Sequence, residues 1–163
     1  MPADVVKPGA GVNTGSKAQI FLGTKLAAAT ATQFASDTYT KLGKVEGIGA
    51  FGVKAGTTTF TDMDQAWDEV FKTSASGGTC AITIGFSEGD GGQQAIAAAV
   101  DDFDTADYNL KIVLVSGATI YLRVKVLSDE FSGFNTKDVV KKNVEVAINA
   151  RPLLVLKPAA TGG

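Results

Sequence analysis

The six residues Gly47 to Gly52, GIGAFG, have the glycine spacing G-x-G-x-x-G that dinucleotide-binding turns use to cradle a pyrophosphate. That chemistry requires a helix that opens at the third glycine, so that backbone N–H groups face the phosphates. Four of the nine residues after Gly52 are threonines, which are β-branched and favour a strand over a helix. We therefore expect a glycine-rich pair of strands, in which absent side chains let another backbone approach closely.

Carboxylates cluster just downstream, at Asp62, Asp64, Asp68 and Glu69. Their spacing could hold a cation, but a calcium loop of the EF-hand type needs Asp or Asn at position 66 and Gly at position 67. This chain has Ala and Trp there. We interpret the cluster as a solvated acidic loop and predict no metal site.

The chain contains no histidine and a single cysteine. Catalysis by Ser-His-Asp or Cys-His groups therefore lies outside its chemistry, as do zinc sites built from histidine or from several cysteines of one chain. Cys80 falls on the apolar side of an alternating segment, which predicts a buried structural thiol. We expect neither an enzyme nor a cofactor.

The chain has 163 residues, enough for one domain, and a net charge of −2 that hides an uneven distribution. Residues 1–60 carry six Lys against three acids, residues 61–107 one Lys against ten acids, and residues 108–163 eight Lys or Arg against four acids. No basic patch is dense enough to indicate nucleic-acid binding. No apolar run reaches the roughly 18 residues of a membrane span, and the N-terminus lacks a secretory signal, so we expect synthesis in the cytoplasm.

Alternation of apolar and polar residues predicts half-buried antiparallel strands at 79–86, 119–127 and 144–149. A first strand is expected at 18–22. Segment 108–115 is more uniformly apolar, so we expect it to be covered on both faces.

One helix is predicted over about residues 91–104. Asp90 can cap its N-terminus, and Gln93 can complete a capping box with it. Ile96 and Phe103 then lie on one face that would pack against the sheet.

These elements indicate a mainly β fold: an antiparallel β-sandwich or split barrel with one α-helix, an extended loop and terminal arms. We expect an N-terminal arm over 1–16, a β domain over 17–150 with a long loop at about 54–76, and a C-terminal arm over 151–163. The apolar run Leu153–Leu156 would aggregate if it stayed an open edge. Arms and surplus apolar surface are typical of an assembly subunit.

Trp67 stands between charged residues in the long loop. Two alternatives remain open: Trp67 anchors in a pocket of a partner, or the loop folds back and buries it on its own core. Lys137, Lys141 and Lys142 are interpreted as a solvated strand face.

Residues 44–86 resemble the central segment of the major tail tube proteins of long-tailed, lambda-type phages, and they read KVEGIGAFGVKAGTTTFTDMDQAWDEVFKTSASGGTCAITIGF. In that family a glycine-rich strand pair leads into a T-x-x-D-type loop, here Thr59 to Asp62. A strand start of the form G-T follows, here Gly78-Thr79, and then a single helix and a strand-rich C-terminal half. The likeness covers roughly residues 18–150 and rests on the order of the motifs.

The resemblance implies a structural subunit of the virion tail that forms hexameric rings stacked into a hollow tube, through which genome DNA is ejected. Strands of neighbouring subunits would join into one barrel around the lumen, and the loop and arms would reach adjacent subunits. The implied partners are further copies of the chain and the tail terminator, tape measure and tail-tip or baseplate proteins; DNA would pass without specific binding, and no membrane insertion is expected. Two alternatives stay open: a tube subunit like that of type VI secretion, and a β-sandwich ligand-binding module.

Three sets of residues carry these expectations. Contacts between subunits or rings are expected from the loop residues Lys54, Thr59, Asp62, Asp64, Trp67 and Phe71. Contacts from the terminal arms are expected at Val5, Val6, Leu153, Leu154, Val155 and Leu156. An acidic lumen would let DNA slide, since each lysine on a phosphate adds salt-dependent affinity. Its candidate residues are Asp62, Asp68, Glu69, Glu88, Asp101 and Asp102. Two alternatives stay open for these acids: they face outward, or they lie between rings.

Overall fold

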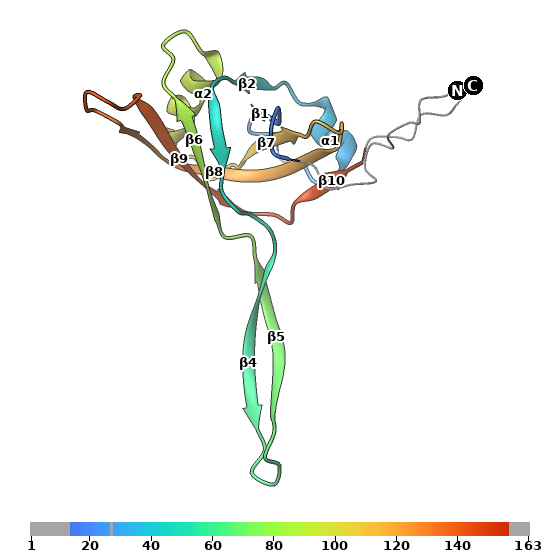
Figure 1. Ribbon diagram of the computed structural model, residues 1–163. Helices are drawn as coiled ribbons and strands as arrows, with labels where there is room; N and C mark the ends of the chain where they lie inside the picture. Colours follow the sequence, from blue (N-terminus) through green and yellow to red (C-terminus); the bar gives the residue numbers. More distant parts are fainter. Residues whose placement is uncertain (1–13, 27, 157–163) are drawn as a thin grey trace, which may run out of the picture.

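The computed structural model describes residues 14–26 and 28–156, which form a sheet-and-helix body and a projecting hairpin (Figure 1). The strands of the body are β1 (Gln19–Leu22), β2 (Thr40–Leu42), β3 (Val45–Ile48), β6 (Thr79–Gly85), β7 (Tyr108–Val113), β8 (Thr119–Ser132), β9 (Lys141–Ile148) and β10 (Leu153–Val155). The helices are α1 (Ala31–Ser36) and α2 (Gly91–Val100), and the hairpin consists of β4 (Lys54–Thr61) and β5 (Asp68–Ser76). The strands of the body pair antiparallel in the order β2-β1-β7-β8-β9-β6-β3, and β10 pairs with β8. The prediction of a mainly antiparallel β fold is confirmed, and a short second helix, α1, joins the expected one.

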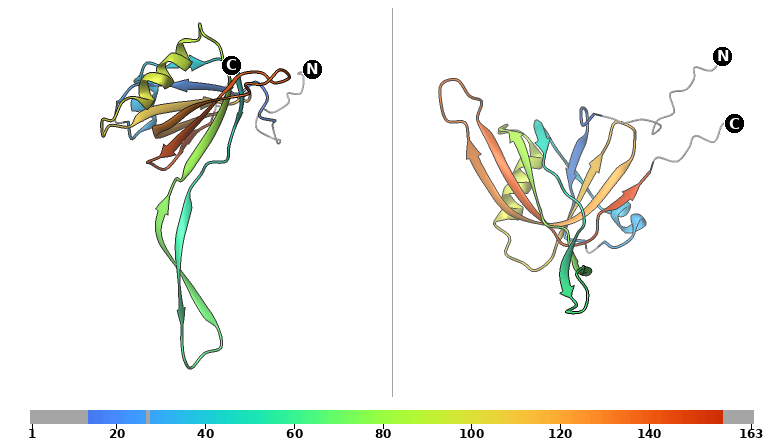
Figure 2. Two further views of the ribbon diagram at one scale, coloured as in Figure 1. Left: turned by 90° about the vertical axis from the view of Figure 1, so that its left-hand side faces the viewer. Right: turned by 60° about the horizontal axis from the view of Figure 1, so that its bottom comes forward.

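The core lies on one face of this sheet. Alternate residues of β6, β8 and β9 point into it, as the period-two pattern predicted, and they include Ile84, Val124 and Val146. α2 packs over this inner face against β8, β2 and β1. Figure 2 shows how strongly the sheet curves, although its described strands do not close into a barrel.

The curvature brings the two ends of the sheet together. β2 and β3 are the first and last strands of the sheet order, yet only Gly43 and Lys44 separate them in the chain. The N-terminus of α2 holds this junction. Asp90 caps the helix at the Gly92 N–H and also accepts a hydrogen bond from the Gly43 N–H at 2.7 Å.

Asp90 is therefore the N-cap that the sequence predicted, but the capping box is wrong. Gln93 is buried, and its amide donates to the carbonyl oxygens of Gly85 at 2.8 Å and Gly43 at 3.4 Å. Its Oε1 accepts from the Ser87 N–H. Gln93 thus links the helix to the β2–β3 junction and to β6 instead of completing the cap.

α2 approaches β2 so closely that no side chain fits between them at Gly92. A Cβ atom there would lie 2.2 Å from the carbonyl oxygen of Lys41. Gly92 lets the helix axis come near enough to bury Ile96 and Ala99 against the sheet.

The helix ends at Val100, earlier than the predicted residue 104. After Val100 the chain is no longer helical, and Asp102 pairs with Lys25 and accepts a hydrogen bond from the Tyr108 hydroxyl. The prediction that Phe103 packs in the core is wrong, because Phe103 lies beyond the helix and is 94% exposed.

A second, smaller cluster covers the outer face of the sheet beside β8. The Ala- and Thr-rich segment forms α1, which begins with a capping box between Thr30 and Gln33. Phe34 of α1 stacks on Tyr121 of β8, with ring centroids 5.1 Å apart. Leu153 and Val155 of β10 pack against the same rings. Part of the expected C-terminal arm is therefore an integral strand of the fold.

The expected long loop at 54–76 is corrected to a β-hairpin, which we call the arm. Its strands have eight and nine residues and pair only with each other, apart from the body of the molecule. The arm projects away from the sheet in every view (Figures 1 and 2). Strand character after Gly52 was predicted from the threonines, but both faces of the arm are exposed, so no alternating pattern marks it in the sequence.

Core and arm are expected to differ sharply in their contribution to stability. Ile84→Ala removes a fully buried side chain and should lower the free energy of unfolding by about 2–5 kcal/mol. Val70→Ala, on the arm, should change it by less than about 0.5 kcal/mol. Denaturant unfolding of both variants checks this, and equal losses would contradict the division into a core and a free arm.

Candidate assembly surfaces

The arm has one aromatic face. Thr58 pairs with Phe71, and Phe60 pairs with Glu69, so these four side chains lie on the same side of the hairpin. Both phenylalanines are at least half exposed. The other face carries the pairs of Thr57 with Lys72, Thr59 with Val70 and Thr61 with Asp68. A two-stranded hairpin by itself is only marginally stable in water, and this one exposes two aromatic rings on one face.

Trp67 lies in the turn at the tip of the arm and is 80% exposed. The loop does not fold back to bury Trp67 on the core, so that alternative is wrong. The other alternative, that Trp67 anchors in a pocket of a partner, stays a prediction. Phe71, Thr59 and Lys54 follow along the strands towards the root of the arm. Their role in contacts between subunits stays a prediction.

The acids at the tip organise the turn. Asp62 Oδ1 accepts from the Asp64 N–H at 3.0 Å, and Asp68 Oδ1 accepts from the Thr61 hydroxyl at 2.8 Å. Within residues 14–26 and 28–156, no group of three or more acids or cysteines is placed to hold a metal ion.

The candidate lumen acids do not form one surface. Asp62, Asp68 and Glu69 belong to the arm, Glu88 is exposed in the turn between β6 and α2, and Asp101 and Asp102 follow α2. Hydrogen bonding to Lys25, to the Asp104 N–H and to Tyr108 holds the pKa of Asp102 at about 2. Lys25 therefore neutralises part of the negative charge counted in the sequence, at the surface of the body.

The residues predicted to make contacts from the two chain termini separate into two groups. Val5 and Val6 lie outside the described residues. Leu153 and Val155 pack in the outer cluster, whereas Leu154 and Leu156 are exposed. Of the four described residues, Leu154 and Leu156 are the ones exposed to contact with another molecule.

Asp107 joins the segment after α2 to β8 and to the residue after β9. Its carboxylate binds Arg123 at 3.0 Å, Lys125 at 3.1 Å and the Asn149 side-chain amide at 2.8 Å. Burial alone would raise the pKa of Asp107, but the hydrogen bonds from Asn149 and Lys125 and the two cationic charges outweigh it and hold this pKa below 3.8. No sequence signal pointed to Asp107, because its partners come from distant strands.

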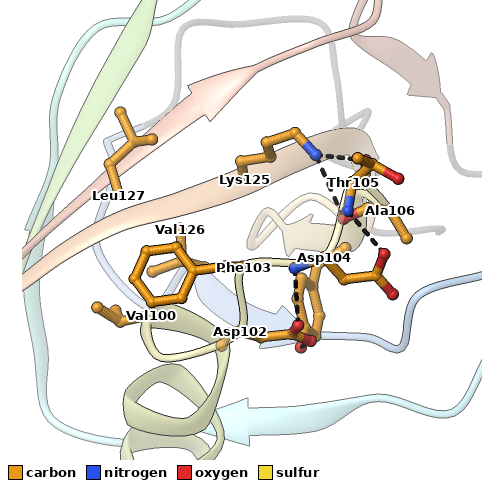
Figure 3. A pocket seen from close by; sticks show the side chains of 11 residues that line it. Val100, Asp102, Phe103, Asp104, Thr105, Ala106, Lys125, Val126 and Leu127 are labelled. Carbon is orange, nitrogen blue, oxygen red and sulfur yellow. Dashed lines mark hydrogen bonds between the residues drawn. The ribbon is translucent and has the colours of Figure 1, made fainter.

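A groove of about 390 Å³ lies between the end of α2 and β8 (Figure 3). Phe103, Val126 and Leu127 line it, together with Lys125, whose ammonium group donates to the Thr105 carbonyl at 2.5 Å. The ionisable side chains that line it are all paired: Asp102 and Asp104 with Lys25, Tyr108 with Asp102, and Lys125 with Asp107. The groove can accept an apolar side chain, but it presents no free acid or base for catalysis.

The glycine motif and Cys80 belong together in the structure. β4 follows the motif and no helix opens there, so the dinucleotide interpretation has no structural basis. A Cβ atom on Gly49 would lie 3.3 Å from the backbone of Ala81, so the predicted close backbone approach occurs at this glycine. Cys80 is buried as predicted. Burial raises the pKa of its thiol, which donates to the Gly49 carbonyl at 3.3 Å.

The prediction that Lys137, Lys141 and Lys142 form a solvated face is wrong for Lys142. It is only 7% exposed, and its ammonium group binds Asp129 at 2.8 Å. Lys137 is exposed as expected, and Lys141 pairs with Glu46.

Among the residues that the structure describes, no helix is both long and apolar enough to span a membrane.

The sequence matches no family model and no curated protein. The structure, however, matches solved structures along most of its length. The SPP1 tail tube superposes with a TM-score of 0.64 at 15% identity, over 90% of this chain and 80% of that chain. The tail of the empty GTA particle, refined with C6 symmetry, gives 0.61 at 12% identity over 90% and 99% of the two chains. The sheath/tube terminator of the contractile injection system PVC gives 0.63 at 9% identity over 89% and 97%.

These neighbours define the class of the fold. The chain has a tail-tube-like fold, which is shared by tubes and terminators of phage-like tails and injection systems. The resemblance drawn from residues 44–86 is confirmed at this level.

Asp107→Asn is expected to lower the free energy of unfolding by about 2–3 kcal/mol at pH 7, because Arg123 and Lys125 lose a largely buried anion. Because the pKa of Asp107 is lower in the folded state, its contribution is fully present above the unfolded pKa of about 4. It disappears as the pH falls through the folded-state value. Unfolding measured from pH 7 to pH 3 should show the difference from wild type shrinking below about pH 4.

The exposed Asp104→Asn serves as the control, with an expected loss below about 1 kcal/mol. A difference for Asp107→Asn that stayed constant down to pH 3 would contradict the role assigned to this carboxylate.

Proposed function

We propose that this chain is the structural subunit of a phage-type tail tube, and that it forms hexameric rings stacked around a lumen through which genome DNA is ejected. The observation that carries the proposal is the arm. It presents Phe60, Phe71 and Trp67 to solvent, and none of its residues belongs to the cores of the chain. A structural role of this kind involves no enzymatic activity.

The edges of the sheet support ring formation. β2 and β3 each have one hydrogen-bonded neighbour among the described strands, so their outer edges are open. Open edges promote aggregation unless they are paired or covered. Copies that join edge to edge in a closed ring would remove these edges and form one continuous barrel around the lumen.

The arm supports stacking. Eight extended residues span about 26 Å, far enough to leave the body and reach a neighbouring ring. A contact between different surfaces of identical subunits is heterologous, and it generates a filament when it does not close on itself. Stacked rings are such a filament.

The proposal places the chain in the virion tail, after synthesis in the host cytoplasm. Its partners are other copies, a tail terminator, a tape measure protein and tail-tip or baseplate proteins. An acidic lumen would keep DNA from binding, and Glu88 and Asp101 are its candidates on the body. Asp102 is a weaker candidate, because Lys25 already neutralises it.

A tube subunit of a contractile injection system is the second candidate function. Solved neighbours include the sheath–tube complex of PVC, with a TM-score of 0.65, and the baseplate of the anti-feeding prophage, also with 0.65. The subunit would assemble in the same way in both cases. A ligand-binding module is less favoured, since the groove beside α2 has its ionisable groups paired.

Purified protein should form hollow tubes or stacked rings in negative-stain electron microscopy, with a matching large species in sedimentation. Replacing residues 57–72 of the arm by a short turn should abolish the tubes but leave the body folded, because the arm adds nothing to the core. Val70→Ala, a mild change on the same arm, is the control.

Tube assembly is to be tested both with the protein alone and with a tail-tip or baseplate nucleus. A chain that stays monomeric at high concentration under both conditions would contradict the proposed function.

A further inference from the structure

The second half of β8 is a further open edge of the sheet. Residues 119–124 of β8 pair with β7 on one side, whereas residues 124–132 pair with β9 on the other side. Among the strands that the structure describes, none pairs with residues 125–132 on the side that faces away from β9. We call this side of residues 125–132 the distal β8 edge. Strands β3, β6, β9 and the second half of β8 thus form a four-stranded segment with an open edge at each border.

Strand direction allows the two borders of this segment to pair between copies. Three antiparallel pairs, β3-β6, β6-β9 and β9-β8, lead from one border to the other, so β3 and β8 run in opposite directions. Rotation of a copy about an axis along the strands leaves all strand directions unchanged. In a ring built by such rotations, β3 of one copy therefore lies antiparallel to the second half of β8 of its neighbour.

The end strand β2 fits this role less well. Six antiparallel pairs separate β2 from β3, so these two strands run in the same direction, and a joint between them would be parallel, which is the slightly less stable pairing. β2 has only three residues, its inward side chain Leu42 is already buried, and its outward side chain is Lys41. Short length and an edge lysine are features that keep an edge strand from pairing.

The inward side chains at the two borders are apolar and incompletely covered. On β3, Val45 and Ile48 lie at the margin of the core and are half-buried. On the distal β8 edge, Phe131 lies on the same inner face and is 50% exposed. A strand that joins the two borders therefore extends one apolar face across the joint and removes exposed area from both sides.

The outward side chains at the two borders are polar. Glu46 of β3 pairs with Lys141 of β9 at 2.6 Å, so its charge is balanced within its own chain. The outward residues of the distal β8 edge are Ser128, Glu130 and Ser132. Because like charges directly opposite each other destabilise a strand pair, we expect Glu46 to face one of the two serines.

We propose that β3 of one copy pairs antiparallel with the distal β8 edge of the next copy in the ring. Backbone hydrogen bonds join the two four-stranded segments, and Val45 and Ile48 pack beside Phe131 of the neighbour. This inference rests on the proposed function, and it names the two edges through which the copies join.

Cysteine cross-linking locates the joint. In a Cys80→Ala background, chains that carry Glu46→Cys together with Ser128→Cys, Glu130→Cys or Ser132→Cys are assembled and then oxidised with diamide. Within one chain β6 and β9 separate these positions by about 14 Å, so a disulfide forms only between copies. We expect a ladder of linked species that ends at the ring size, strongest for Ser128→Cys or Ser132→Cys.

Lys41→Cys combined with the same three positions is the matched control, because Lys41 is exposed on the outward side of β2. It should give no ladder. Electron microscopy of the same samples separates this inference from the proposed function. Tubes without a cross-link from position 46 to any of the three positions, or with equal yields from position 41, would overturn the joint and leave the tube intact. Absence of both tubes and cross-links would overturn both.

Hydrogen exchange of the unmodified protein gives an independent readout. Amides in residues 45–48 and 128–132 should exchange roughly tenfold more slowly, or slower still, in assembled than in monomeric fractions, because new backbone hydrogen bonds protect them. Amides in residues 40–42 should change by less than about twofold. Exchange in residues 45–48 and 128–132 that stays unchanged on assembly would contradict the joint.

Discussion

One helix has to cover the apolar face of an eight-stranded sheet, and most of the architecture follows from that constraint. A helix of ten residues is about 15 Å long and about 10 Å wide, whereas seven neighbouring strands span roughly 30 Å. The sheet therefore curves around α2 until its end strands β2 and β3 are joined by two residues. Asp90 and Gln93 hold that junction, and Gly92 lets helix and strand touch.

The same constraint explains what is left uncovered. α2 ends at Val100, so the inner face of the sheet extends past it, and Phe86 after β6 and Phe131 and Phe134 of the β8–β9 hairpin are exposed. The arm leaves the body altogether and buries nothing of its own. The residues that the structure describes thus present two apolar surfaces and open strand edges, and the proposed assembly would cover them. The residues that stabilise the body and those proposed to mediate assembly thus lie in different parts of the sequence.

The sequence predicts elements well where one face is buried. β6, β8 and β9 alternate because their inner residues pack under α2, and Asp90 follows from a local capping rule. The hairpin structure of the arm could not be predicted from alternation, because neither of its faces is buried. The hydrogen bonds of Gln93 could not be predicted either, because its partner Gly43 is 50 residues away in the sequence. Lys142 was placed in solvent because of its residue type. A register shift between Val126 and Ser128 moves Asp129 and Phe131 onto the inner face, where they enclose Lys142.

Trp67 is the only tryptophan in the chain and is 80% exposed at the tip of the arm, so its fluorescence reports directly on whether assembly covers the arm. The measurement is the emission maximum and acrylamide quenching of the protein in monomeric and in assembled fractions. If the arm docks on another copy, the emission should shift to shorter wavelength and the quenching constant should fall on assembly. Emission and quenching that stay the same in assembled material would contradict the claim that the arm joins the copies.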